Sequence, residues 1–216
     1  MDVEQNKEQA KILGITGGVG AGKSTVLEYL QEAYDACLLR CDDVAKELQE
    51  PGSSCFAHLA ALLAPYGCIR DGRLDRKACA ELLFSDKALL EKVNAIVHPA
   101  VRAEVEHRIA QQRGIAPLIV IEAALLIQSG YAEICDEIWG ICADKEVRAK
   151  RLAASRGYSP ERIRAMFASQ PEDVFFREHS QLTIDNSCED VHNIYEQIDR
   201  GLIEHGLLQH CQREQR

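Results

Sequence analysis

The segment from Lys11 to Leu30 constrains the fold of this chain more than any other part of it. It begins with an apolar run, Ile12 to Ile15, which is typical of a buried strand, and then has four glycines within six residues. An apolar face returns between Val26 and Leu30 at the spacing of a helix. The residues from Gly17 to Ser24 fit G-x-x-x-x-G-K-S in the strand, loop and helix context that this motif requires. The segment therefore predicts a phosphate-binding loop; the alternative is a glycine-rich turn that happens to precede a lysine.

The chemistry of a phosphate group explains this spacing. Glycines adopt positive φ angles and carry no Cβ, so successive backbone N–H groups can turn inward around an anion. A helix that begins near Lys23 adds the positive end of its dipole. We expect Lys23 to reach the β- and γ-phosphates of a nucleotide and the hydroxyl of Ser24 to bind Mg²⁺. The loop residues predicted to bind the nucleotide are Gly17, Gly18, Val19, Gly20, Ala21, Gly22, Lys23, Ser24 and Thr25.

Composition limits the class of protein. A chain of 216 residues with 46% hydrophobic residues suits one α/β domain with insertions. No apolar run approaches the roughly 20 residues that span a bilayer, and the polar segment from Met1 to Lys11 does not resemble a secretory signal. The net charge of −9 disfavours a nucleic-acid partner, which normally requires a basic face. We expect a cytoplasmic monomer or weak homo-oligomer without membrane or nucleic-acid partners.

The nine cysteines are scattered along the chain and include no C-x-x-C pair. An odd number of cysteines without an export signal predicts reduced thiols in a cytosol. A zinc site assembled from distant cysteines is the alternative, but the paired spacing typical of zinc ligands is missing.

Two predicted strands end in acidic residues. The first, Ala36 to Arg40, continues directly into Cys41, Asp42 and Asp43. Acids at the end of a parallel strand lie at the edge where α/β sheets bind their ligands. Asp42 is therefore a candidate base near the phosphate loop, and Asp43 a candidate cap of the next helix; a cap is also the alternative for Asp42. The strand Leu118 to Ile121 ends in Glu122, a candidate to orient Mg²⁺ directly or through water, or else an acid that faces solvent.

The region between these two strands, residues 44–114, has a helical pattern and no convincing strand. Asp75 and Ser85 are predicted caps of two of its helices. His98 and Pro99 are predicted to break the helical structure before a last helix, Ala100 to Gln112. An insert of this size between strands predicts a helical subdomain over the carboxyl edge of the sheet, where a second substrate is commonly held.

The basic part of this acidic chain lies between Arg148 and Arg164, with six basic residues and one acid. Ser159 followed by Pro160 predicts a clean helix start. Two arginine-bearing helices joined at Gly157 predict a lid over phosphates, where one arginine can contribute about 10³–10⁵ in rate and closure excludes water. Arg151 and Arg156 are the favoured lid arginines, and the alternative is a solvated charged face.

These motifs together predict a small-molecule kinase. The chain has no N-K-x-D motif, and no D-x-x-G follows a strand as a GTPase switch requires. We expect an α/β fold: a P-loop NTPase-type parallel sheet flanked by helices, with a helical substrate-binding insert and a helical lid. The expected parts are a nucleotide-binding core of residues 1–43, 115–145 and 180–216, an acceptor-binding subdomain of residues 44–114, and a lid of residues 146–179.

The sequence resembles the dephospho-coenzyme A kinase family from about Ile12 to Gly201. The phosphate loop is common to many families, whereas the L-D-R, N-x-x-x-H-P and I-D-N blocks in this order are far more particular. The matching blocks are Thr16 to Thr25, Asp42 to Leu48, Glu50 to Gly52, Asp71 to Arg76, Asn94 to Pro99, Ala124 to Leu126, Lys150-Arg151, Gln170 and Ile184 to Asn186.

The resemblance implies phosphorylation of the ribose 3′-hydroxyl of dephospho-coenzyme A by ATP with Mg²⁺, the last step of coenzyme A synthesis. Asp42 matches the acid taken as general base, Lys23 the phosphate-binding lysine and Ser24 the Mg²⁺-binding hydroxyl. The two rival interpretations are another small-molecule or nucleotide kinase and an ATP-binding regulator that transfers no phosphate.

The resemblance also implies roles for residues outside the loop. Arg76, Asn94 and His98 fall in the helical region associated with the acceptor; His98 could instead be a buried structural residue. Arg151 matches a lid arginine, and Asn186 lies where the adenine end of ATP is expected.

The chain departs from the family pattern at three positions. Arg40 stands where an aspartate is usual, two residues before Asp42. Glu122 replaces an aspartate, so its longer side chain could favour a water-mediated contact with Mg²⁺. Gln128 replaces a glutamate and cannot act as a charged ligand. Arg40 and Gln128 are the only support for the regulator interpretation.

Overall fold

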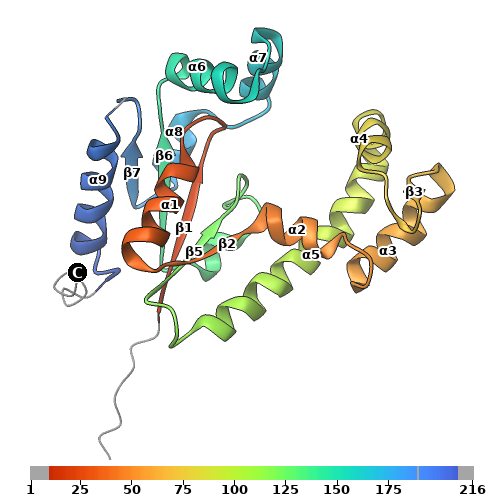
Figure 1. Ribbon diagram of the computed structural model, residues 1–216, viewed down its shortest axis with the longest axis horizontal. Helices are drawn as coiled ribbons and strands as arrows, with labels where there is room; N and C mark the ends of the chain where they lie inside the picture. The colour runs from red at the N-terminus through yellow and green to blue at the C-terminus, as the bar shows by residue number, and fades with distance from the viewer. Residues whose placement is uncertain (1–9, 189, 209–216) are drawn as a thin grey trace, which may run out of the picture. The chain divides into compact units, whose positions relative to one another are not determined.

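A five-stranded sheet in the order β2-β5-β1-β6-β7 organises the fold (Figure 1). The structure is a computed structural model that describes residues 10–188 and 190–208, so most of the segment predicted not to be a secretory signal lies outside the described residues. Strand β1 pairs in parallel with β5 and β6, and β6 pairs in parallel with β7. The predicted parallel sheet is thereby confirmed. The strands of this sheet are β1 (Lys11–Gly17), β2 (Cys37–Arg40), β5 (Leu118–Glu122), β6 (Glu137–Cys142) and β7 (Leu182–Asp185).

The chain divides into two units, one of residues 1–39 and 111–216 and the other of residues 40–110. The segment predicted as a lid belongs to the first unit. The helices of the first unit are α1 (Lys23–Tyr34), η2 (Tyr131–Ile134), α6 (Lys145–Arg156), α7 (Pro160–Ala168), α8 (Asp173–Glu178) and α9 (Val191–Glu204). The elements that begin in the second unit are α2 (Cys41–Leu48), α3 (Ser54–Leu63), η1 (Ala64–Tyr66), β3 (Ile69–Arg70), β4 (Arg73–Leu74), α4 (Arg76–Ser85) and α5 (Lys87–Gln112).

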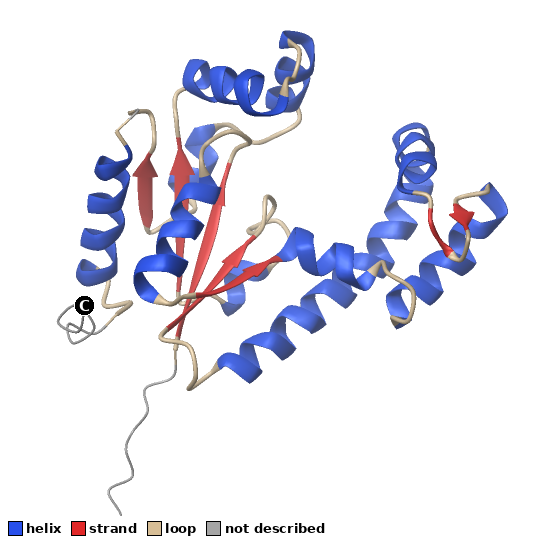
Figure 2. Ribbon diagram, in the orientation of Figure 1, coloured by secondary structure: helices blue, strands red, loops and turns tan. Residues whose placement is uncertain are grey.

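Helices cover both faces of the sheet in the first unit (Figure 2). Helices α1 and α9 pack on the face that carries Leu13, Ile15 and Trp139. Helix α8 covers the opposite face so closely that a Cβ on Gly140 would lie 3.2 Å from the carbonyl oxygen of Phe176. Because β1 is buried on both faces, it is a near-continuous apolar run, as expected for a central parallel strand. This packing fixes the carboxyl end of β1, from which the phosphate loop emerges.

The second unit contains helices and one short antiparallel ribbon, β3–β4. The prediction that residues 44–114 lack a strand is therefore wrong. Each of the two strands has only two residues, too few for an alternating pattern, and the turn between them places Asp71 and Gly72 at φ 50° and 73°. Two consecutive positive φ angles are typical of the hairpin turn with the twist of the flanking strands.

Helix α5 is a single helix of 26 residues that contains Pro99, so the predicted break at His98–Pro99 is wrong. Proline removes one backbone hydrogen bond and usually kinks or ends a helix. Here Val97, Val101 and Val105 are buried on one face on both sides of the proline. Burial of this apolar stripe stabilises the helix across the missing bond.

The predicted caps of the helices in the second unit have different outcomes. Asp75 caps α4 by accepting the Ala78 N–H at 3.1 Å, as predicted. The prediction for Ser85 is wrong, because its hydroxyl donates back to the carbonyl of Leu82 at 2.8 Å. Asp86 instead begins α5 by accepting the Leu89 N–H at 2.9 Å.

A buried thiol in the second unit leads to a testable prediction about pH. Burial, together with a hydrogen bond with Cys68, raises the pKa of the Cys79 thiol to about 11. An unfolded cysteine titrates near pH 8.5, so above that pH the unfolded chain binds fewer protons than the folded chain. The contribution of Cys79 to stability is therefore complete below about pH 8.5 and is lost as the pH rises through about 11.

We expect the difference in free energy of unfolding between the wild type and Cys79→Ala to shrink as the pH is raised over this range. Urea denaturation at a series of pH values measures it. A constant difference would show that the thiol is not held protonated by the fold.

Candidate active site

The loop between β1 and α1 has the backbone that a phosphate-binding loop requires. Gly17, Gly20 and Gly22 have φ angles of 145°, 76° and 94°. A Cβ on Gly17 would lie 2.2 Å from the carbonyl oxygen of Ile141, and one on Gly22 would lie 1.9 Å from Nδ2 of Asn186. Larger residues would therefore be excluded both by the backbone angle and by the packing.

Two backbone amides of the loop donate hydrogen bonds within the protein. The Val19 N–H donates to Oε1 of Gln170 at 2.8 Å, and the Ala21 N–H donates to the carbonyl of Gly18 at 3.2 Å. The first N–H groups of a helix have no acceptor within the helix itself. The amides available to an anion are therefore expected from Gly20 and from the start of α1, rather than from Val19.

The structure brings the predicted phosphate-binding lysine and the predicted metal-binding acid together. The Nζ atom of Lys23 donates to the carbonyl of Gly17 at 2.8 Å and lies 3.9 Å from Oε1 of Glu122. Both side chains are mostly buried. Ile15 of β1 is paired with Glu122 of β5, so the ends of the two strands lie side by side. Ser24 lies in the first turn of α1 and is exposed. The alternative that Glu122 faces solvent is wrong.

Asn186 lies against the loop and connects it with Arg151. Its Nδ2 atom donates to the carbonyl of Ala21 at 2.8 Å, and its side-chain oxygen accepts from Nη2 of Arg151 at 3.1 Å. Nη1 of Arg151 also donates to the backbone carbonyl of Asn186 at 2.9 Å. Arg156 lies at the end of α6 and is exposed, with its guanidinium 6.0 Å from the ring of Tyr158. Within the described residues no polar contact joins Arg156 to the loop.

Sequence reasoning missed the importance of Arg148, which is only 3% exposed. Its Nε donates to the carbonyl of Val19 at 2.9 Å, and its Nη1 lies 2.7 Å from Oδ1 of Asp173. The guanidinium also lies 4.6 Å from the ring centre of Phe167. Together with Gln170, Arg148 therefore holds both backbone polar groups of Val19.

The position of Arg148 on α6 becomes informative only once the buried face of this helix is known. Arg148 stands four residues before Leu152, which is buried on the inner face of α6, so the two share one helix face. A basic residue on an inward face needs a partner, and none of the other five basic residues of the run is buried. Gln170 was among the matching blocks, but nothing in the sequence connects it with Val19.

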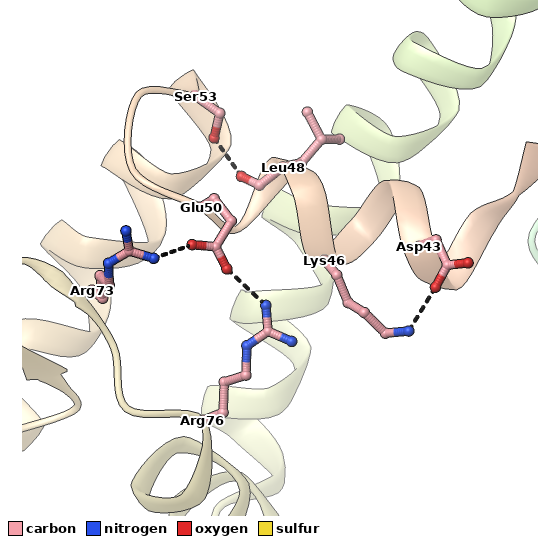
Figure 3. A network of polar contacts seen from close by, with 7 residues as sticks. All are labelled: Asp43, Lys46, Leu48, Glu50, Ser53, Arg73 and Arg76. Carbon is pink, nitrogen blue, oxygen red and sulfur yellow. Dashed lines mark hydrogen bonds and ion pairs between the residues drawn. The ribbon is translucent and has the colours of Figure 1, made fainter.

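The acids that follow β2 are not helix caps, so both cap interpretations are wrong. Helix α2 begins at Cys41 with Arg40 at the cap position and no side-chain cap. Asp42 and Asp43 lie within its first turn. Asp43 bonds Lys46 at 2.6 Å, which lowers the pKa of its carboxyl group (Figure 3). Asp42 is exposed.

The predicted acceptor residues of the second unit are polar groups at its surface. The two carboxylate oxygens of Glu50 accept from Arg73 and Arg76, each at 2.9 Å (Figure 3). Asn94 and His98 lie one helical turn apart on α5, and therefore on one side of it. His98 is exposed, so the alternative that it is a buried structural residue is wrong.

Among the residues that the structure describes, no group of three or more His, Cys, Asp or Glu side chains could hold a metal ion. The eight described cysteines form no disulfide with one another. Over the same residues, no helix combines the length and the apolar character needed to cross a bilayer.

Comparison with known proteins identifies the family. The family model described as dephospho-CoA kinase matches residues 11–191. A dephospho-CoA kinase of Symbiobacterium thermophilum is 38% identical over 162 residues, which cover 74% of this chain and 67% of that protein. One from Geobacter sulfurreducens is 34% identical over 177 residues, which cover 82% of this chain and 89% of the relative.

A solved structure has a similar fold. The crystal structure of TT1252 from Thermus thermophilus superposes with a TM-score of 0.79 at 29% identity, and the match covers 91% of this chain and 98% of that one. The family model and these relatives confirm the resemblance drawn from the phosphate loop and the blocks that follow it, and this chain belongs to the dephospho-CoA kinase family.

Proposed function

We propose that this protein transfers the γ-phosphate of ATP to the ribose 3′-hydroxyl of dephospho-coenzyme A. The observation that carries the proposal is the glycine-built loop with Lys23 held at its base, between the carbonyl of Gly17 and the carboxylate of Glu122. This arrangement suits a triphosphate, because a cradle of backbone amides and one buried ammonium group face the same anion. Its family membership supplies the acceptor.

The residues of the first unit would bind the phosphates and stabilise the charge that develops on them. Lys23 would contact the β- and γ-phosphates. Arg151 would contribute a second cation, since a guanidinium carries five N–H donors and its contacts with Asn186 use two. The transferring group is loosely bound in the transition state, so positive charge fixed beforehand lowers the barrier.

The donor atoms near the loop also fit Mg²⁺. Mg²⁺ prefers oxygen ligands and commonly keeps several waters, and it is bound by one or two protein groups together with substrate phosphates. The Ser24 hydroxyl on α1 and the Glu122 carboxylate at the end of β5 are the oxygen donors that would hold it. When bound, the ion would neutralise phosphate charge, and Glu122 would orient it directly or through water.

Asp42 would accept the proton of the attacking ribose hydroxyl. It stands two residues after the end of β2, whose neighbour in the sheet is β5, the strand that ends in Glu122. A general base must release the accepted proton to solvent before the next turnover, so its carboxylate must be accessible to water. Asp42 is exposed. In-line transfer requires the ribose hydroxyl to be held close to the γ-phosphate and in line with the bond that breaks. A second substrate-binding region would hold the acceptor in this orientation.

The acceptor would be bound by residues of the second unit that the resemblance indicates. Arg76 is oriented by its bond to Glu50, and Asn94 and His98 present polar groups on one side of α5. Dephospho-coenzyme A carries a diphosphate, so an oriented arginine is a suitable partner for it.

Arg76→Ala is expected to raise KM for dephospho-coenzyme A by about tenfold or more, because one charge-assisted hydrogen bond contributes about 1.5–3 kcal/mol. KM for ATP should change by less than about twofold. Steady-state kinetics with each substrate varied in turn measure both. Arg102→Ala is the matched control, since Arg102 is also a surface arginine of this unit paired with a glutamate, Glu106, at 2.9 Å. An equal effect in both variants would assign the loss to general surface charge.

Mass spectrometry of the product tests the proposed function itself. The protein is mixed with ATP, Mg²⁺ and dephospho-coenzyme A, and formation of coenzyme A is followed together with ADP. Coenzyme A formation that depends on the protein supports the proposal. ADP release with other alcohol acceptors alone would indicate a different small-molecule kinase, and ATP binding without any transfer would indicate a regulator.

A further inference from the structure

The peptide groups of the phosphate loop are held from outside by three side chains. Gln170 accepts the Val19 N–H at 2.8 Å, and Arg148 donates to the Val19 carbonyl at 2.9 Å. Asn186 donates to the Ala21 carbonyl at 2.8 Å. None of these three residues belongs to the loop motif, and they lie between 129 and 165 residues from their partners along the chain.

These bonds determine where the following amides point. In a trans peptide the C=O and the next N–H are antiparallel, because both lie in one rigid plane. When Arg148 draws the Val19 carbonyl outward, the Gly20 N–H points to the opposite side, toward the interior of the loop. The bond from Asn186 to the Ala21 carbonyl directs the Gly22 N–H inward in the same way. Amides aimed inward before binding need no rearrangement when an anion arrives.

Arg148 is built into the fold as a rigid support. It is 3% exposed, paired with Asp173 at 2.7 Å and packed on the ring of Phe167. A Cβ on Gly18 would lie 2.3 Å from Nη2 of Arg148, so a glycine at this position of the loop is needed for the approach of the arginine. A buried guanidinium with these partners has a single geometry, and the carbonyl that it holds is fixed with it.

We infer that Arg148 and Gln170 are positioning residues for the triphosphate: they fix Val19 by both of its backbone polar groups and so aim the loop amides at the phosphates. The inference rests on the proposed function only in taking ATP as the ligand of the loop. The basic helix α6 thus contributes to phosphate binding through the backbone of the loop, in addition to any direct contact of its arginines.

Two pairs of variants separate positioning from stability. Arg148→Met removes the donor, whereas Arg148→Gln keeps an N–H on the atom attached to Cδ, the same place as Nε of arginine, and so keeps the bond to Val19. Gln170→Met removes the acceptor of the Val19 N–H. Gln181→Met is its matched control, because Oε1 of Gln181 accepts the Ile138 N–H at the same distance of 2.8 Å, away from the loop.

The experiment measures the Kd for ATP by calorimetry without acceptor, KM for each substrate, and the melting temperature. We expect Arg148→Met and Gln170→Met to raise the Kd and KM for ATP by about tenfold, with KM for dephospho-coenzyme A within twofold of the wild type. Arg148→Gln should keep the Kd within about threefold. Gln181→Met should lower the melting temperature as much as Gln170→Met and leave the Kd for ATP unchanged.

Other results would overturn the inference. A Kd for ATP within twofold of the wild type in both Arg148→Met and Gln170→Met would show that the two residues only stabilise the fold. The same conclusion follows if Gln181→Met weakens ATP binding as much as Gln170→Met does. If Arg148→Met does not fold, Gln170→Met and its control decide alone. Wild-type protein that binds ATP but forms no coenzyme A would refute the proposed function and leave this test intact.

Discussion

Asp42→Asn is expected to lower kcat for coenzyme A formation by about 10²–10⁴-fold, the usual contribution of a positioned acid or base. Asparagine has nearly the same shape as aspartate but cannot accept the proton of the ribose hydroxyl. The Kd for ATP should stay within about twofold, since the proposed phosphate contacts all come from the first unit. Mass spectrometric rate measurements at saturating substrates give kcat, and calorimetry gives the Kd.

The adjacent residue supplies the control for this experiment. Asp43 is in the same helical turn, and its carboxylate is paired with Lys46. Asp43→Asn removes one negative charge from the same place and should leave kcat within about threefold, since surface ion pairs of this kind contribute little. Similar losses in both variants would mean that the charge of this turn matters rather than the base. Unchanged turnover in Asp42→Asn would remove Asp42 from the mechanism.

The phosphate loop and the strands around it could be predicted because their signals are local. Gly17 to Ser24 form a contiguous motif, and the predicted strands next to it are short runs of mostly apolar residues. Glu122 could be placed near Lys23 because parallel strands end at one edge, and the pairing of Ile15 with Glu122 confirms this reasoning. Patterns of contiguous residues such as these determine the local structure without information about distant contacts.

The supports of the loop could not be predicted, because their partners are distant in the sequence. Gln170 and Arg148 lie 151 and 129 residues from Val19. In the sequence, Arg148 is one of six basic residues in a run, and only the packing of α6 distinguishes it from the exposed Arg156. The continuity of α5 through Pro99 could not be predicted either. It depends on the burial of an apolar helix face in the folded protein, which overrides the tendency of proline to end a helix.

The basic segment therefore has more than one function in the proposed mechanism. Its sequence predicts a lid whose arginines contact phosphates. In the structure Arg148 contacts the loop backbone, and Arg151 contacts Asn186, which in turn contacts the loop. Any movement of α6 would be transmitted to the loop, because these bonds connect α6 to the loop backbone directly through Arg148 and indirectly through Arg151 and Asn186. We expect that phosphate binding and the position of this segment depend on one another.

Lys23→Met is expected to lower kcat/KM for ATP by about 10²–10³-fold, comparable to the loss of one group aimed at developing charge in other enzymes. Methionine fills much of the volume of the lysine stem, so the change removes mainly the ammonium group. The variant also leaves the mostly buried Glu122 without this cation, so a small change in melting temperature accompanies the kinetic effect. Steady-state kinetics and calorimetry of ATP binding separate the loss into kcat and Kd.

Lys11→Met controls for the removal of a lysine from the same region. Lys11 begins β1, the strand that leads into the loop, and is likewise paired with an acid, Asp136, at 3.6 Å, but it is half-exposed and lies at the end of β1 away from the loop. Its replacement should leave kcat/KM for ATP within about twofold, as expected for a screened surface pair. If Lys23→Met keeps wild-type kcat/KM, the ammonium group does not contact the triphosphate, and its bonds to Gly17 and Glu122 are structural. If instead both variants lose activity equally, net charge rather than the geometry of the loop governs ATP binding.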